Sequence, residues 1–154
     1  MPTLFPPKGR LYHRIPPWVP DGEVFHVRVR CRWEQPQPLT DPELASHLLN
    51  SVRHYHDCGR WYCVLFLLMP DHWHGLLAFP VAPGMSATIR AWKAFHTRLH
   101  GICWQDGYFD HRIRGGEQLT LKGDYIRRNP VVKGLCARPD DWRWKIDLAG
   151  MGRD

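Results

Sequence analysis

The stretch WYCVLFLLMPDHWHGLLAF, residues 61–79, contains two apolar runs that are separated by a Pro-Asp dipeptide. It predicts a buried strand over residues 61–68 and an antiparallel partner strand over residues 72–79. Side chains at positions i and i+2 of a strand point to the same face, so His72 and His74 project together. Two residues span about 6.6 Å along a strand, and two imidazoles can converge on one metal ion across that gap.

The segments before this hairpin show a strand pattern and then a helix pattern. Residues 24–33 alternate apolar and basic side chains, which predicts a strand with one buried face. Asp41 followed by Pro42 is a helix start, because the acid caps the first turn and proline suits the first helical position. Apolar residues at helical spacing continue this helix to Gly59.

The segments after the hairpin predict a helix, a strand and a last helix. Ser86 is expected to cap a helix that ends at Gly101. Residues 108–114 predict a short fourth strand, and residues 117–129 predict a helix that Pro130 stops. The inner side of the first of these helices is expected to carry Ile89, Trp92, Phe95, His96 and Leu99.

The predicted order β-α-β-β-α-β-α is that of an α+β protein. It corresponds to a ferredoxin-like βαββαβ (RRM-like) antiparallel sheet with an added C-terminal helix. The first and third strands are central in this topology, which would place the two histidines on a rigid inner strand. We divide the 154 residues into a proline-rich N-terminal arm (residues 1–22), one domain (residues 23–145) and a C-terminal tail (residues 146–154).

Tyr125 and Asn129 lie four residues apart on the last predicted helix, so they share one face of it. If this face covers the strand that carries His72 and His74, two imidazoles, an amide oxygen and a phenol converge. The first three form a neutral ligand set that leaves positions of a divalent metal open, and the phenol is a nucleophile. This set suits phosphodiester chemistry at a metal that polarises a phosphoryl oxygen.

These motifs resemble those of the single-tyrosine HUH transposases, and most closely the REP-associated tyrosine transposase (RAYT) branch of the insertion-sequence transposases. The matching residues are MPDHWH at 69–74 and DYIRRNPVVKGL at 124–135. Between them, WQ at 104–105 and FDHRIR at 109–114 also resemble that branch. The likeness spans about residues 23–145, with the motifs in the same order and spacing.

The resemblance implies that His72 and His74 bind the metal, that Asn129 is the third ligand and that Tyr125 is the catalytic residue. Members of the family cut single-stranded DNA near hairpins and form a 5′-phosphotyrosine and a free 3′-hydroxyl. The bond energy stays in that linkage, so rejoining needs no ATP. Phosphate chemistry with open octahedral positions favours Mg²⁺ or Mn²⁺ as the cofactor.

The chain has a formal net charge of +6, and 16 of its 21 basic residues are arginines. Arginine favours phosphate contacts and stacking on bases, so single-stranded or hairpin DNA is the expected partner, although charge alone also fits a solvated basic surface. Eight side chains are expected to contact DNA, namely Arg28, Arg30, Lys93, His111, Arg112, Arg114, Arg127 and Arg128.

Five scattered cysteines form no C-x-x-C pair, which favours reduced thiols in a cytosol. The first 20 residues contain no apolar signal-peptide core, and no run approaches the roughly 18 apolar residues of a membrane span. We therefore expect a soluble cytoplasmic protein of bacterial type that is associated with nucleoid DNA and not with a membrane. Both a monomer and a homodimer are consistent with the resemblance.

Two other functions fit parts of the sequence. A non-catalytic ferredoxin-like protein that binds single-stranded nucleic acid would need exposed aromatic side chains on the first and third strands, and this chain offers mainly arginines and histidines there. A hydrolase of small phosphodiesters would need a third alternating histidine, but position 76 is Leu76. A phosphoesterase with two such histidine motifs would instead need a second His-x-Thr/Ser element. His96 and Thr97 do not supply it, because they lack the spacing. The hypothesis that accounts for most residues is an enzyme, a metal-dependent DNA endonuclease and strand transferase.

Overall fold

The computed structural model describes residues 23–148. The predicted N-terminal arm and the last six residues of the predicted tail lie outside this range. Within it, the elements follow the predicted order, with a short 3-10 helix and a further strand after the last α-helix. They are β1 (Val24–Arg30), α1 (Pro42–Asp57), β2 (Tyr62–Leu68), β3 (His72–Ala78), α2 (Met85–His100), β4 (Phe109–Ile113), α3 (Gly115–Val132), η2 (Pro139–Asp141) and β5 (Lys145–Asp147).

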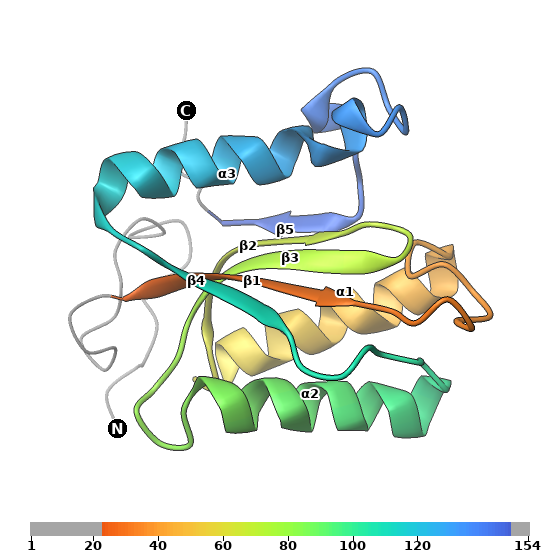
Figure 1. The fold of residues 1–154 in the computed structure, drawn as a ribbon, viewed down its shortest axis with the longest axis horizontal. Helices are drawn as coiled ribbons and strands as arrows, with labels where there is room; N and C mark the ends of the chain where they lie inside the picture. The colour runs from red at the N-terminus through yellow and green to blue at the C-terminus, as the bar shows by residue number, and fades with distance from the viewer. Residues whose placement is uncertain (1–22, 149–154) are drawn as a thin grey trace.

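An antiparallel sheet with the strand order β4-β1-β3-β2-β5 forms the middle of the molecule (Figure 1). Its first four strands have the ferredoxin-like order, so the predicted α+β fold is confirmed. The register pairs Arg28 with His74 and Arg30 with His72 across β1 and β3. Residues that lie opposite each other in an antiparallel pair share one face, so these four side chains lie together.

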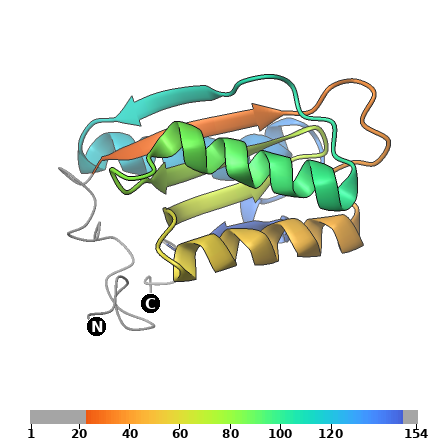
Figure 2. The ribbon, with the colours of Figure 1, turned by 90° about the horizontal axis from the view of Figure 1, so that it is seen from below.

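Helices α1 and α2 cover one face of the sheet, and α3 covers the other (Figures 1 and 2). The face under α1 and α2 is filled by large aromatic side chains. Trp61, Phe66, Trp73 and Trp92 are completely buried there. Neighbouring ring centres in this group lie between 4.6 and 6.3 Å apart, a spacing at which aromatic pairs stabilise beyond their buried area. This face therefore holds the main core.

A smaller core lies between α3 and the opposite face of the sheet. Ile126 packs there with Leu67 and Leu76 of the strands. Gly123 is also buried on the inner side of α3, where the Arg127 guanidinium lies 3.0 Å from the position that a Cβ atom would take. Helix α3 buries few of its side chains. It therefore leaves a pocket beside it, and this pocket is lined by polar residues of β1 and β3.

Arg127 ties α3 to β5. Its Nε and Nη2 donate to the Asp147 carboxylate at 2.6 and 3.0 Å, and its Nη1 donates to Asp124 at 3.2 Å. Asp147 belongs to β5, which pairs with the edge of β2. β5 therefore extends the sheet to Asp147. Three residues are too few to show the alternation from which a strand is predicted.

The apolar face of α2 is narrower than predicted. Ile89, Trp92 and His96 are buried as expected, whereas Phe95 and Leu99 are 42% and 61% exposed. Trp92 and His96 occupy the line of closest contact with the sheet and α1. Phe95 and Leu99 flank that line, so they face solvent although their spacing from it is helical.

Two helix ends also differ from the prediction. The N-cap of α2 is Gly84, so Ser86 lies inside the first turn and does not cap it. Helix α3 continues past Pro130 to Val132. Proline lacks one N–H group and crowds the carbonyl four residues earlier, but the N–H of Lys133 still donates back into the helix and closes a further turn. Between residues 23 and 148, no helix has both the length and the apolar character that crossing a bilayer requires.

Candidate metal and nucleic-acid site

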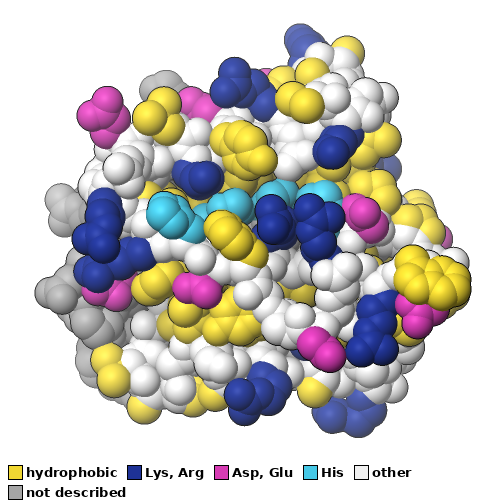
Figure 3. All heavy atoms as spheres, viewed as in Figure 1, with side chains coloured by type: hydrophobic (Ala, Val, Ile, Leu, Met, Phe, Trp, Pro, Cys, Tyr) yellow, Lys and Arg dark blue, Asp and Glu magenta, His cyan; other side chains and the backbone are white. Residues whose placement is uncertain are grey.

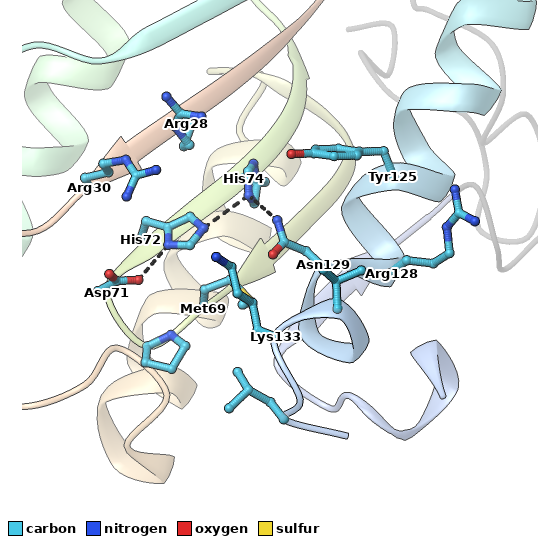
Figure 4. Close-up of a pocket in the computed structure, with 13 residues that line it drawn as sticks. Arg28, Arg30, Met69, Asp71, His72, His74, Tyr125, Arg128, Asn129 and Lys133 are labelled. Atoms are coloured by element: carbon cyan, nitrogen blue, oxygen red, sulfur yellow. Dashed lines mark hydrogen bonds and ion pairs between the residues drawn. The ribbon is translucent and has the colours of Figure 1, made fainter. Parts of the chain in front are cut away.

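His72 and His74 point from β3 into the space beside α3 (Figure 4). Their Nε2 atoms lie 3.2 Å apart, and the two rings are nearly perpendicular. Both side chains are buried within the protein. Residues i and i+2 of a strand lie on the same face, and here this spacing brings the two ring nitrogens close together.

The Asp71 carboxylate determines where the proton of His72 lies. Asp71 Oδ1 is 2.7 Å from His72 Nδ1, so Nδ1 carries the proton and donates it to the carboxylate. A neutral imidazole has a single N–H group, which leaves a lone pair on Nε2. A carboxylate behind a histidine is also a common arrangement for metal-ligating histidines, because it fixes the ring and raises its basicity.

Both ring nitrogens of His74 have partners. Asn129 Nδ2 donates to His74 Nε2 at 2.9 Å, and His26 Nε2 lies 2.9 Å from His74 Nδ1. With the Asn129 amide in this orientation, Nε2 accepts, so the single proton of neutral His74 lies on Nδ1. His72 and His74 therefore turn two lone pairs toward each other, an arrangement that a cation between them would stabilise.

Burial keeps these histidines neutral. It is the main cause that lowers the pKa of His74 from 6.5 to about 2, and the neighbouring His72 and His26 add to the effect. Burial likewise lowers the pKa of His26 to about 4, with a smaller contribution from Lys122. It also lowers the pKa of His72, against the opposing effect of Asp71. Neutral imidazole is the form that binds metals, so the lone pairs are available near pH 7.

The donor set fits a small divalent metal ion. Two nitrogens bound at about 2.1 Å to one ion lie about 3.0 Å apart at a right angle and about 3.4 Å apart at a tetrahedral angle. The Nε2–Nε2 distance of 3.2 Å falls between these values. In residues 23–148, no three His, Cys, Asp or Glu side chains are grouped so that they could hold a metal. A third protein ligand would thus be the Asn129 amide. Rotation of this amide by half a turn would bring Oδ1 to the place beside His74 that Nδ2 now occupies.

Tyr125 lies one turn before Asn129 on α3, and 53% of it is exposed. Its ring centre is 6.5 Å from that of His74 and nearly perpendicular to it. Figure 4 shows its hydroxyl pointing across the pocket toward His74 and Arg28. Lys122 Nζ lies 5.3 Å from the centre of the Tyr125 ring, which places a positive charge beside the phenol.

A pocket of about 690 Å³ opens in front of the two histidines. Figure 3 shows histidine side chains in a row across this side of the molecule, with Lys or Arg side chains next to them. A second hollow of about 330 Å³ lies along α3 and contains His111 and Lys122. Tyr125 lines both spaces. The charged residues that line the larger pocket are Arg28, Arg30, Asp71, Arg128 and Lys133.

The structure brings half of the predicted DNA-contacting residues to this surface. Arg28, Arg30 and Arg128 line the larger pocket, and His111 lines the second hollow. Arg28 also lies 4.9 Å above the ring of Phe109, which leaves the guanidinium stacked at the pocket edge. Cationic side chains from β1 and α3 thus face each other across the histidines.

The other predicted contacts lie apart from the pocket. Arg127 is held by two carboxylates, and Lys93 Nζ donates to backbone carbonyls of residues 105 and 107 at 2.9 and 2.8 Å. Lys93 therefore holds a loop on the α2 side of the sheet. Arg112 forms an ion pair with the glutamate that precedes β1, and Arg114 is the N-cap residue of α3.

Three residues of the site escaped the sequence prediction, namely His26, Asp71 and Lys122. Asp71 belongs to the Pro-Asp dipeptide between the two predicted strands, and its position next to His72 was the available signal. His26 stands two positions before Arg28 in the alternating strand, which places it on the same face as Arg28. Lys122 stands three positions before Tyr125, which is one helical turn.

The fold has a counterpart among solved structures. The chain is similar to a REP-associated tyrosine transposase bound to a REP hairpin, with a TM-score of 0.70 and 23% sequence identity. The match covers 82% of this chain and 78% of that chain. At this identity the likeness establishes a shared fold. No family model matches the sequence, and no curated protein matches it.

Proposed function

We propose that this protein is a metal-dependent single-stranded DNA endonuclease and strand transferase of the REP-associated tyrosine transposase type, which acts near DNA hairpins. The observation that carries the proposal is a single pocket in which Tyr125 stands beside His72, His74 and Asn129. The structural likeness to a transposase bound to a REP hairpin supports the same class of substrate. The protein would act on DNA in the cytoplasm.

Mg²⁺ or Mn²⁺ would be held by His72 and His74 through Nε2 and by Asn129 through Oδ1. When bound, the ion polarises a non-bridging oxygen of the scissile phosphate. All three ligands are neutral, so the charge of the ion remains available to an anionic phosphodiester. Asp71 keeps His72 in the ligating tautomer by accepting the Nδ1 proton.

Tyr125 would supply the nucleophile. Its hydroxyl oxygen attacks the phosphorus, a tyrosine O–P bond forms and the P–O3′ bond breaks. The 5′ phosphate stays on the protein, and the departing 3′ oxygen takes up a proton to become a hydroxyl. The phenol loses its own proton to water, which reaches the half-exposed ring. One phosphodiester replaces another, so attack by a 3′-hydroxyl reverses the step without ATP.

The two spaces beside Tyr125 would together form a path for a single strand. Arg28, Arg30 and Arg128 place positive charge on one side of the tyrosine, where guanidinium groups can bind phosphates through paired hydrogen bonds. Lys122 lines the hollow that Tyr125 shares on the other side. A strand that follows α3 would have its scissile phosphate at Tyr125 and its flanking nucleotides in these two spaces.

The test is whether a covalent protein–DNA adduct forms. The wild-type protein is incubated with hairpin-bearing single-stranded oligonucleotides and Mn²⁺, and products are separated under denaturing conditions. We expect an adduct that Tyr125→Phe abolishes without loss of DNA binding. Tyr108→Phe is the matched control, because Tyr108 lies in a separate pocket beside α2, and this variant should keep the adduct.

Two results would contradict the proposal. An undiminished adduct with Tyr125→Phe would mean that another residue is the nucleophile. DNA binding without any adduct in the wild type, with or without Mn²⁺, would instead favour the non-catalytic nucleic-acid-binding protein. A nucleic-acid-binding protein with this fold usually needs an open sheet face on which bases stack. Here α3 lies over the sheet face that α1 and α2 leave uncovered (Figure 1).

A further inference from the structure

We propose that His26 is a positioning residue of the metal site, which holds His74 in the tautomer that can bind a metal. The inference rests on the proposed function, because it concerns the same pocket. His26 belongs to β1 and does not line that pocket. It would act through His74 and would not touch the substrate.

The contact between the two rings has the geometry of an in-plane hydrogen bond. His26 Nε2 and His74 Nδ1 are 2.9 Å apart, and the ring planes differ by 24°. The ring centres are 5.1 Å apart, close to the nitrogen–nitrogen distance plus the two distances from centre to nitrogen. The two nitrogens therefore lie almost on the line between the ring centres, where a shared proton points directly at the acceptor.

The direction of this hydrogen bond follows from the neighbouring groups. In the metal-free structure the Asn129 amide turns Nδ2, a donor, toward His74 Nε2. With the amide in this orientation, Nε2 accepts and the proton of His74 lies on Nδ1. That proton is donated to His26 Nε2. A metal ion at His74 Nε2 needs the same arrangement, with a lone pair on Nε2 and the proton on Nδ1. His26 thus accepts the hydrogen bond from His74 Nδ1 in the metal-free structure, and it would have to accept the same hydrogen bond when the metal is bound.

His26 has little other reason to occupy this position. It is only 3% exposed, and its Nδ1 is buried without a hydrogen-bond partner among the described residues. The Phe109 ring packs against the His26 ring at a steep angle, with the two ring centres 5.5 Å apart. An apolar side chain would fill this place without burying an unsatisfied nitrogen. The bond to His74 is therefore the interaction that a histidine adds here.

Without this acceptor, His74 would lose its preference between the two neutral tautomers. The form with the proton on Nε2 cannot bind a metal through that atom, and the ring would also be freer to rotate. Loss of such a supporting partner typically lowers metal affinity by about 10- to 100-fold. We expect a loss of this size for His26→Leu, which keeps an apolar side chain in the buried place and removes the acceptor.

The experiment measures Mn²⁺ affinity by titration and the His74 tautomer by nitrogen-15 NMR, in the full-length protein. His26→Leu should bind Mn²⁺ about 10- to 100-fold more weakly and should shift the His74 proton toward Nε2. His26→Gln, whose amide oxygen can accept, should restore part of both. His96→Leu is the matched control, because His96 is equally buried on the opposite face, and it should leave Mn²⁺ affinity unchanged.

The two readouts separate this inference from the proposed function. If the wild type does not bind Mn²⁺, the metal site is wrong, and the tautomer of His74 in the wild type still decides the role of His26. A wild-type His74 with its proton on Nε2 would overturn the inference. So would wild-type Mn²⁺ affinity together with an unchanged tautomer in His26→Leu, or in His26→Phe, which also lacks an acceptor, if the leucine variant does not fold.

Discussion

The two faces of the sheet both bury histidine, but they surround it with different partners. Under α1 and α2, His96 contacts the faces of the Trp92 and His100 rings, and its Nε2 lies 2.9 Å from Ser51 Oγ. Under α3, His74 is buried to the same degree, but its neighbours are the nitrogens of two other histidines and an amide. Aromatic neighbours stabilise a fold by packing, whereas converging nitrogens cost stability unless a ligand satisfies them. The partners of a buried histidine, and not its burial, indicate whether it belongs to a site.

The largest effect should come from the packed face. Trp92 is completely buried and contacts Trp61, Phe66 and Trp73. Trp92→Ala should lower the free energy of unfolding by about 3–5 kcal/mol, because it leaves a large cavity in the main core. Urea denaturation followed by circular dichroism measures this loss.

Trp92→Phe is the control for this cavity. It keeps an aromatic ring and removes an indole N–H that is buried without a partner in residues 23–148. We expect it to cost far less than the alanine variant. Equal losses for both variants would show that the indole edge, and not the filled volume, stabilises this face.

Acid should weaken the packed face through His96. Burial is the main cause that lowers the pKa of His96 to about 4, and the nearby His100 and His47 add to it. The unfolded chain therefore binds a proton at His96 more readily than the folded one. The contribution of neutral His96 to the free energy of unfolding is fully present above pH 6.5 and is lost as the pH falls toward 4. The full loss from this residue is at most about 3 kcal/mol.

The measurement is the free energy of unfolding at pH 7 and at pH 4.5, in the wild type and in His96→Gln. Glutamine cannot take up the proton, so the variant should lose less stability between the two pH values. The histidines under α3 also have lowered pKa values, and they contribute equally to the pH dependence of both proteins. An identical slope in both proteins would contradict a protonation at His96.

The α3 face should respond to metal, and the packed face should not. Binding of Mn²⁺ at 100 times its dissociation constant stabilises the folded state by about 2.7 kcal/mol. Thermal melts with and without Mn²⁺ measure this shift, which His72→Ala should abolish. Trp92→Phe should keep it, because the substitution lies on the other face. A wild type that melts at the same temperature with and without Mn²⁺ would refute the metal site.

Two adjacent arginines on α3 should separate stability from binding. Arg127 donates to the carboxylates of Asp147 and Asp124, whereas Arg128 lines the pocket. Arg127→Ala should cost about 2 kcal/mol of unfolding free energy, because it removes the charged hydrogen bonds that join α3 to β5. Arg128→Ala should leave stability unchanged and weaken DNA binding with a smaller salt dependence. The reverse pattern would place Arg127 in the DNA contact.

The sequence was sufficient for the fold and for the elements that carry the site. Alternation in β1, the apolar hairpin and the helical spacing of Tyr125 and Asn129 depend on local rules, and those rules hold here. His26 could not be assigned to His74, because alternation gives the face of a strand but not its register against a neighbour. The bonds from Lys93 to the carbonyls of residues 105 and 107 could not be predicted for a similar reason, since a basic side chain on a helix does not reveal which loop it contacts.

The smallest effect should come from the flank of α2, where helical spacing alone predicted too wide an apolar face. Leu99 is mostly exposed there and Ile89 is buried, although both stand at core spacing relative to Trp92. Leu99→Ala should change the free energy of unfolding by less than about 0.5 kcal/mol, because an exposed side chain leaves no cavity. Ile89→Ala, the matched control, should cost about 2–5 kcal/mol. A comparable loss from Leu99→Ala would mean that this flank is covered in solution, and that the packed face extends further around α2 than its exposed side chains indicate.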